Sequence, residues 1–229
     1  MSGVVGPRFR VIQDGLVLNL DASNTLSYPG SGTTWFDLTS NNNDGTLING
    51  PTFDSANGGS IVFDGMSDYV NLTNISIGTN PFTINIWFKI NQNQTTNNAL
   101  ISVAASGTAN NFQLSFINDT QLLFFYKGIG VENAFNLVTS FALNTWYNVC
   151  ITKDSNNNIR SYVNASQTAT VNYVANYNFS EIIRLGINRS ETNYYNGNIS
   201  LVQIYVNNGL SDAQVLQNYN ALKNRFKLE

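Results

Sequence analysis

The chain of 229 residues contains no histidine. Without imidazole there is no Ser-His-Asp or Cys-His nucleophile, no HExxH zinc site and no histidine proton shuttle near neutral pH. A single cysteine, Cys150, excludes an internal disulfide, a CxxC redox pair and a structural zinc site built from thiolates. Because Cys150 falls between two apolar residues of an expected strand, we predict a buried, unreactive thiol. These absences remove much of the enzyme repertoire.

Charge is also scarce. Lys, Arg, Asp and Glu make up 11% of the chain, less than half of the roughly 25% usual in soluble domains. The net charge is −3 and the isoelectric point is near 4.8, which argues against nucleic acid or an anionic membrane as the main partner. No run approaches the roughly 20 apolar residues of a membrane span, and the N-terminus lacks the apolar segment of a signal peptide.

Asparagine and apolar residues are abundant. Apolar side chains form 42% of the chain, enough for a sizeable core, and there are about 38 asparagines. Asn, Gly, Ser and Thr suit turns and sheet surfaces better than helix interiors. The composition therefore favours β structure.

Apolar residues alternate with polar ones along most of the chain, which predicts strands. In FTINIWFKI (82–90) five apolar side chains share one face, and Trp87 lies on the other, where we expect a second core layer together with Trp146. The segments FINDTQLLFF and ITKDSNNNIRSYV are typical of hairpins. About thirteen strands are expected, at 16–20, 45–48, 60–64, 68–72, 82–90, 99–103, 112–117, 121–126, 146–153, 159–164, 169–173, 182–187 and 199–206.

One helix is predicted over residues 212–225. Ser211 fits its N-cap, and Gln214 three positions later completes a capping box. The apolar residues that recur at helical spacing, and that we expect to pack on a sheet, are Val215, Leu216, Tyr219, Leu222 and Phe226.

Five segments follow one another in an order typical of a known family. They are SIVFDGMSDYVNL (60–72), FTINIWFKI (82–90), NTWYNVCITKD (144–154), IRSYVNASQTA (159–169) and LGINRS to LQNYNAL (185–222). Together they resemble the laminin-G-like jelly roll of the concanavalin A-like lectin/glucanase superfamily, over about residues 15–225. The resemblance implies an all-β fold, a two-sheet antiparallel jelly-roll sandwich with a short C-terminal helix. One departure is Ala165, where the family hairpin usually carries Gly.

The resemblance also suggests a setting. Residues 15–53 look like a subgroup common in phage structural proteins and in surface proteins of environmental bacteria. We therefore expect an N-terminal arm (1–14) before a jelly-roll domain (15–229), in a virion protein that decorates a head or is associated with a tail. An extracellular or cell-surface location is the alternative. The arm could dock on a neighbouring subunit or another virion protein, or be a disordered tail.

Because the superfamily includes glucanases, the resemblance allows for glycan hydrolysis, which would need paired carboxylates on one strand. The four glutamates are isolated from one another: Glu132, Glu181, Glu191 and Glu229. Asp64 and Asp68 are separated by a turn and need not share a face. We therefore expect no catalytic activity.

The resemblance implies that a calcium ion could be bound, and calcium takes oxygen ligands from Asp, Asn and carbonyl groups. The densest candidates are Asp37, Asn43 and Asp44 in one loop and Asp64 and Asp68 in another. The alternative is that these residues form turns through hydrogen bonds to their own backbone.

Sugar recognition needs flat aromatic faces beside amides and carboxylates. Trp35 and the loop residues Asn188, Arg189, Asn193, Tyr194 and Tyr195 offer that mixture. Trp35 and one of the tyrosines could instead pack inward. The function we expect is a surface-displayed adhesion or carbohydrate-binding module, a lectin whose partner is a cell-surface glycan. Its rivals are a purely structural virion or cell-surface protein and, less favoured, a glycan-cleaving enzyme.

Overall fold

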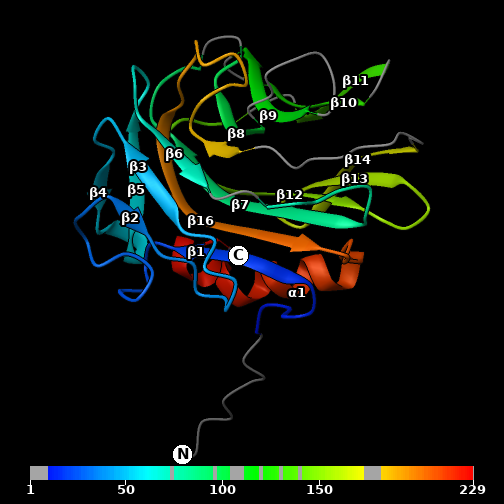
Figure 1. Cartoon of the computed structure of the whole chain (residues 1–229), viewed down its shortest axis with the longest axis horizontal. Coiled ribbons are helices and arrows are strands. Elements are labelled where there is room, and N and C mark those ends of the chain that lie inside the picture. Colours follow the sequence, from blue (N-terminus) through cyan, green and yellow to red (C-terminus); the bar gives the residue numbers. More distant parts are fainter. Residues whose placement is uncertain are drawn as a thin grey trace, which may run out of the picture.

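The computed structural model describes residues 10–72, 75–94, 97–103, 111–118, 121–128, 131–138, 141–172 and 182–228. Two antiparallel sheets of eight strands each face one another (Figure 1). Sheet A runs in the order β14 (Ser166–Asn172), β13 (Asn158–Val163), β12 (Trp146–Lys153), β7 (Phe82–Ile90), β16 (Asn196–Val206), β5 (Ser60–Asp64) and β4 (Thr52–Asp54), and β1 (Leu16–Asp21) also pairs with β16. Sheet B runs in the order β11 (Val131–Val138), β10 (Gln121–Gly128), β9 (Asn111–Asn118), β8 (Ala99–Val103), β15 (Ile183–Leu185), β6 (Tyr69–Leu72), β3 (Gly45–Ile48) and β2 (Thr34–Trp35).

This architecture confirms the expected jelly-roll sandwich. Each of the thirteen predicted segments contains a strand, and both predicted hairpins form, as β9–β10 and β12–β13. The sequence pattern missed β2, β4 and β11. Two of these are only two and three residues long, and β11 (VENAFNLV) does not alternate apolar with polar residues.

The main core fills the space between the sheets. The alternate side chains of β7, from Phe82 to Ile90, belong to one buried cluster with Phe112, Leu114 and Phe116 of β9. Burial of this apolar surface is the dominant favourable contribution to folding.

The outer face of sheet A is covered as well. Helix α1 (Asp212–Leu222) and the 3₁₀ turn η2 (Lys223–Phe226) lie along it, below sheet A in Figure 1. Trp87 stacks on Tyr219, with ring centroids 5.5 Å apart, and on Phe226, at 4.3 Å. Trp146 joins the same buried cluster, which confirms the expected second core layer.

The helix differs from its prediction at its end, because α1 stops at Leu222 and η2 follows, and in one side chain. Ser211 is the N-cap, and its backbone N–H donates to Gln214 Oε1 at 2.9 Å. Leu216 is 49% exposed, whereas Asn218 is buried. Asn218 takes the inward position because it donates to the Tyr205 hydroxyl at 2.9 Å and accepts from the Ile12 backbone N–H at 2.8 Å. The expectation for Leu216 is therefore wrong.

These contacts also hold the described part of the predicted arm. Tyr205 Oη donates to the Ile12 carbonyl at 3.1 Å, and Gln217 Nε2 donates to the Arg10 carbonyl at 2.8 Å. Residues from Arg10 onward thus lie against helix α1 of their own chain. Residues 1–9 are outside the described residues, and docking of the arm on another subunit stays a prediction. Among the described residues, no helix has both the length and the apolar character needed to cross a membrane.

A row of amide side chains crosses the outer face of sheet A, and we call it the amide ladder. Its members Asn19, Gln203 and Asn85 are strand partners in register, and Asn148, the partner of Trp87, lies diagonally across from Asn85. Asn148 donates to Asn85 Oδ1 at 2.8 Å, Asn85 to Gln203 Oε1 at 3.0 Å, and Gln203 to Asn19 Oδ1 at 3.2 Å. Buried polar groups need such partners, because a lost partner leaves a desolvated group unpaired.

The β13–β14 hairpin turns through two residues. Asn164 has a φ of 49° and Ala165 a φ of 62°, and Val163 pairs directly with Ser166. Two central residues with positive φ make a type I′ turn, the tight connection that suits the twist of paired strands. The turn forms although position 165 carries Ala and not Gly. Ala165 therefore adopts a left-handed conformation, which its β-carbon makes unfavourable.

We expect Ala165→Gly to raise the free energy of unfolding by about 1 kcal/mol, because it relieves this conformation. The rise in melting temperature should be about 2–4 °C. In a matched control, Ala169→Gly within β14 should lower stability, because glycine weakens a strand interior. A lower melting temperature for Ala165→Gly would contradict the expectation.

Asn85→Leu should lower the free energy of unfolding by about 2–4 kcal/mol, because Gln203 and Asn148 would each lose a buried partner. Urea unfolding monitored by tryptophan fluorescence measures this loss. The control Asn224→Ala, at an exposed position of η2, should change stability by less than about 0.5 kcal/mol. If the two substitutions lower the free energy of unfolding equally, the hydrogen bonds of the ladder do not contribute to stability as expected.

Candidate functional site

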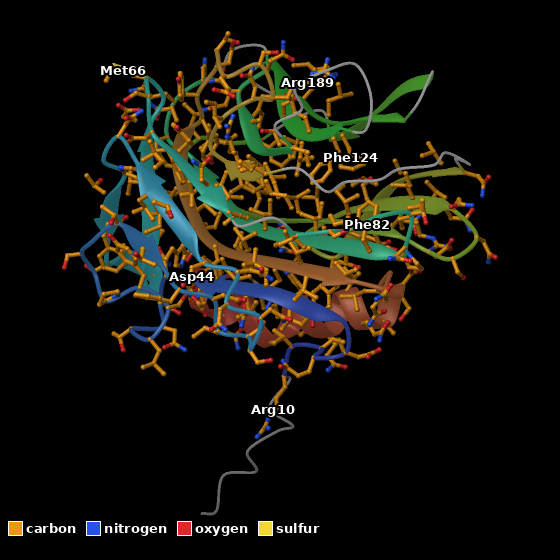
Figure 2. The ribbon with its side chains drawn as sticks, in the orientation of Figure 1. Arg10, Asp44, Met66, Phe82, Phe124 and Arg189 are labelled. Atoms are coloured by element: carbon orange, nitrogen blue, oxygen red, sulfur yellow. The ribbon has the colours of Figure 1, made fainter. Side chains whose placement is uncertain are left out.

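A hollow of about 540 Å³ lies at one end of the sandwich, where three segments distant in sequence meet. Figure 2 shows Met66 and Arg189 at this end of the molecule, away from Arg10. We call this cavity the larger hollow. The described residues that line it are Asp64, Gly65, Met66, Gln92, Asn93, Asn98, Thr192, Asn193, Tyr194 and Asn196.

Asn196, the first residue of β16, connects the three segments. Its backbone N–H donates to Gln94 Oε1 at 3.2 Å, and its carbonyl accepts from Gln94 Nε2 at 2.8 Å. Its own amide donates to the Asp64 carbonyl at 2.7 Å. The buried Gln94 side chain thus pairs with Asn196 as a neighbouring strand would, which holds the segment after β7 against the floor of the larger hollow.

The turn after β5 is built around the Asp64 carboxylate. Asp64 Oδ1 accepts the backbone N–H groups of Met66, Ser67 and Asp68 at 2.8–3.2 Å. Partial burial opposes ionisation of Asp64, but these hydrogen bonds outweigh it and lower the pKa of the carboxyl. The turn therefore presents an ionised carboxylate at neutral pH and leaves Met66 74% exposed.

Asp68 has a different environment. It is buried, and its Oδ2 accepts the Asp64 backbone N–H at 3.1 Å. Desolvation raises the pKa of Asp68, and the nearby charge of Asp64 adds to this, although the backbone hydrogen bond opposes it. Asp68 therefore supports the turn and does not line the larger hollow.

The loop after β15 folds over the outer face of sheet B. Asn188 Oδ1 accepts the backbone N–H groups of Thr192 and Asn193, at 2.9 and 3.2 Å. The Arg189 backbone N–H donates to Gln113 Oε1 at 3.1 Å, and Arg184 Nη1 lies 2.5 Å from Glu191 Oε1. Beside this loop is a second cavity of about 230 Å³, the smaller hollow, lined by Asn97, Gln113, Leu123, Asn188, Arg189 and Ser190.

The structure brings together part of the predicted sugar-binding set. Asn193 and Tyr194 line the larger hollow with Asp64, and Asn188 and Arg189 line the smaller one. The sequence did not single out Met66, Gln92, Asn93 or Asn98. In a chain with so many asparagines, no local signal separates a lining amide from one that forms a turn.

Two of the predicted residues are not available to a ligand. Trp35 is 0% exposed. Tyr195 is also fully buried, donates its hydroxyl to the Lys89 carbonyl at 2.8 Å and stacks on Phe116, and burial raises its pKa well above the ordinary value. The sugar-binding assignment of Trp35 and Tyr195 is therefore wrong, because both rings pack inward. Cys150 is buried as expected, and burial raises its pKa.

The loop that carries Asp37, Asn43 and Asp44 does not fit a calcium ion. Asp37 Oδ1 accepts the backbone N–H groups of Asn19 and Thr39, and its Oδ2 accepts the Thr39 hydroxyl at 2.6 Å and the Asn43 N–H at 3.0 Å. Asp44 Oδ1 accepts the Asp37 N–H at 2.8 Å. Hydrogen-bond donors thus occupy the positions a cation would need. Within the described parts of the chain, no three His, Cys, Asp or Glu side chains gather in a group that could hold a metal.

We expect EDTA to leave the melting temperature unchanged, because the Asp37 and Asp64 carboxylates are stabilised by N–H donors. Differential scanning calorimetry with EDTA and with excess calcium measures this. If calcium raises the melting temperature of the wild-type protein but not that of Asp37→Asn or Asp64→Asn, the expectation is wrong. The ion would then bind at the carboxylate whose substitution removes the effect.

Residues 63–216 match the model of a protein family described as the concanavalin A-like lectin/glucanase superfamily. No curated protein sequence gives a significant match. Several solved structures share the fold. Domain 4 of AbnA, an extracellular arabinanase from Geobacillus stearothermophilus, in complex with arabinotriose, is 16% identical with a TM-score of 0.72, over 91% of this chain and 100% of that chain.

The binding domain of botulinum neurotoxin DC is also similar. Its complex with rat synaptotagmin II is 20% identical with a TM-score of 0.71, and its complex with SialylT is 19% identical with a TM-score of 0.69. The matches cover 92% and 91% of this chain but 52% of each neurotoxin chain, so the present chain corresponds to about half of that domain. At these identities the likeness shows the fold.

Proposed function

The chain belongs to the concanavalin A-like lectin/glucanase superfamily, and on this premise we propose that it is a non-catalytic carbohydrate-binding domain. The observation that carries the proposal is the larger hollow, which combines one tyrosine, one carboxylate and five side-chain amides at one end of the sandwich. The glycan binds there, where strand β5 ends at Asp64 and strand β16 begins at Asn196.

The chemistry of the lining suits a sugar. A pyranose ring has an apolar face and an edge of hydroxyl groups, so it needs an apolar platform beside donors and acceptors. Tyr194 and the exposed Met66 supply apolar surface. A side-chain amide carries both donors and an acceptor, and the ionised Asp64 accepts hydrogen bonds from hydroxyl groups.

The site is also held in place before a ligand arrives. Gln94 and Asn196 fix one wall, the Asp64 carboxylate fixes its own turn, and Asn188 fixes the 188–193 loop. Fewer groups then need ordering on binding, which favours affinity for a polar ligand.

The same geometry argues against glycan cleavage. Glycosidases need two carboxyl groups that face one another across the bond, about 5–9.5 Å apart. Among the described residues that line the larger hollow, Asp64 is the only carboxylate, because Asp68 is buried under the turn. Glu181 and Glu229 lie outside the described residues. Glu191 pairs with Arg184 on the loop.

Similar structures support the proposal by analogy. One was solved with arabinotriose and another with SialylT. For the setting, we propose a virion, as a head decoration or a tail-associated protein, with a cell surface as the alternative. This rests on the resemblance of residues 15–53, and capsid and tail genes beside the gene for this chain would support it.

Tyr194→Ala should weaken glycan binding about tenfold, because it removes the ring that would stack on the sugar. A glycan array identifies the ligand, and isothermal titration calorimetry measures the dissociation constant. Phe36→Ala is the matched control: Phe36 is 44% exposed but lines neither hollow, so binding should not change. If the wild-type protein binds no glycan at high concentration, with and without calcium, the purely structural role is favoured instead.

A further inference from the structure

The two hollows share a wall. Asn188 lines the smaller hollow, and its side chain bonds directly to Thr192 and Asn193, which line the larger one. On the other side, Asn97 lines the smaller hollow and Asn98 the larger. The cavities are thus neighbours on either side of one short loop.

Their sizes suggest that they serve one ligand. The larger hollow, at about 540 Å³, falls within the roughly 300–1,000 Å³ of pockets that hold a small molecule by themselves. The smaller hollow, at about 230 Å³, falls below that range. It is suited to one unit or substituent of a ligand that is anchored next to it.

The two linings carry opposite charges. Among the described residues that line each cavity, Asp64 is the one charged group of the larger hollow and Arg189 that of the smaller. An arginine stays protonated at any physiological pH and binds a carboxylate through two parallel N–H donors. Ser190 and the amide of Asn97 add donors beside it. An anionic group is therefore favoured in the smaller hollow and disfavoured beside Asp64.

From this arrangement we propose that the domain recognises an acidic oligosaccharide, with a neutral sugar in the larger hollow and a carboxylate-bearing sugar in the smaller hollow beside Arg189. The proposal rests on the proposed carbohydrate-binding function and adds the class of glycan. The 188–193 loop lies beneath the linkage between the two sugars. Its hydrogen bonds to Asn188 keep the two subsites at a fixed spacing.

Matched pairs of oligosaccharides test the proposal. Each pair consists of a neutral glycan found to bind on the array and the same glycan extended by one sialic or uronic acid. We expect calorimetry to show about tenfold tighter binding of the acidic member, the effect of one charge-assisted hydrogen-bonded pair. The preference should decrease as salt is raised.

Three variants locate the effect. Arg189→Gln should abolish the preference, while the backbone N–H that anchors the loop to Gln113 is retained. Ser190→Asp adds a negative charge at an exposed position and should reverse the preference. Arg160→Gln removes a charge that pairs with Asp154 and lines neither hollow, so it should leave the preference unchanged. Thermal melting of each variant confirms that it is folded.

The outcomes separate the two proposals. If neutral glycans bind but their acidic partners bind no better, or if Arg189→Gln weakens both members of a pair equally, the acidic subsite is overturned and the carbohydrate-binding function stands. If neither member of any pair binds the wild-type protein, both proposals fall.

Discussion

The hydrogen bond between side-chain amides is the interaction on which this structure depends. The chain has few charges, and its single cysteine cannot form an internal disulfide. Many of its buried polar positions are therefore occupied by Asn and Gln. An amide supplies a donor and an acceptor in one plane, as a peptide group does. The amide ladder uses this property across strands β1, β16, β7 and β12, and Gln94 uses it to pair with the backbone of Asn196.

The same property links the fold to the candidate site. Side chains of Asn188, Asn196 and Gln94 fix the walls of the hollows, while other amides nearby remain on the lining. One residue type thus builds the support and supplies the recognition groups. The described lining residues are mostly polar and uncharged, and the charged ones among them are Asp64 and Arg189.

The fold was largely predictable because strands with one face in a core carry an alternating pattern. FTINIWFKI and WYNVCITK were assigned with the right bounds, and the Trp87 layer followed from the face opposite the core. The pattern places Leu216 inward, but Asn218 takes the buried position, because apolar spacing alone cannot foresee a buried amide that bonds to Tyr205 and Ile12. The larger hollow combines residues from three segments and the smaller one residues from four, and sequence spacing does not show which segments meet at the same place in a sandwich.

Helix α1 makes the two ends of the molecule different from one another. Because the helix and the residues from Arg10 onward cover the outer face of sheet A, that side is occupied by the chain itself. The larger hollow lies at one end of the sandwich and the smaller beside it on sheet B, and Figure 2 shows Arg10 and Arg189 at opposite ends of the view. A chain tethered to a larger body through its N-terminal side would therefore stand with its helix toward the anchor and its hollows facing outward, without any hinge or rearrangement.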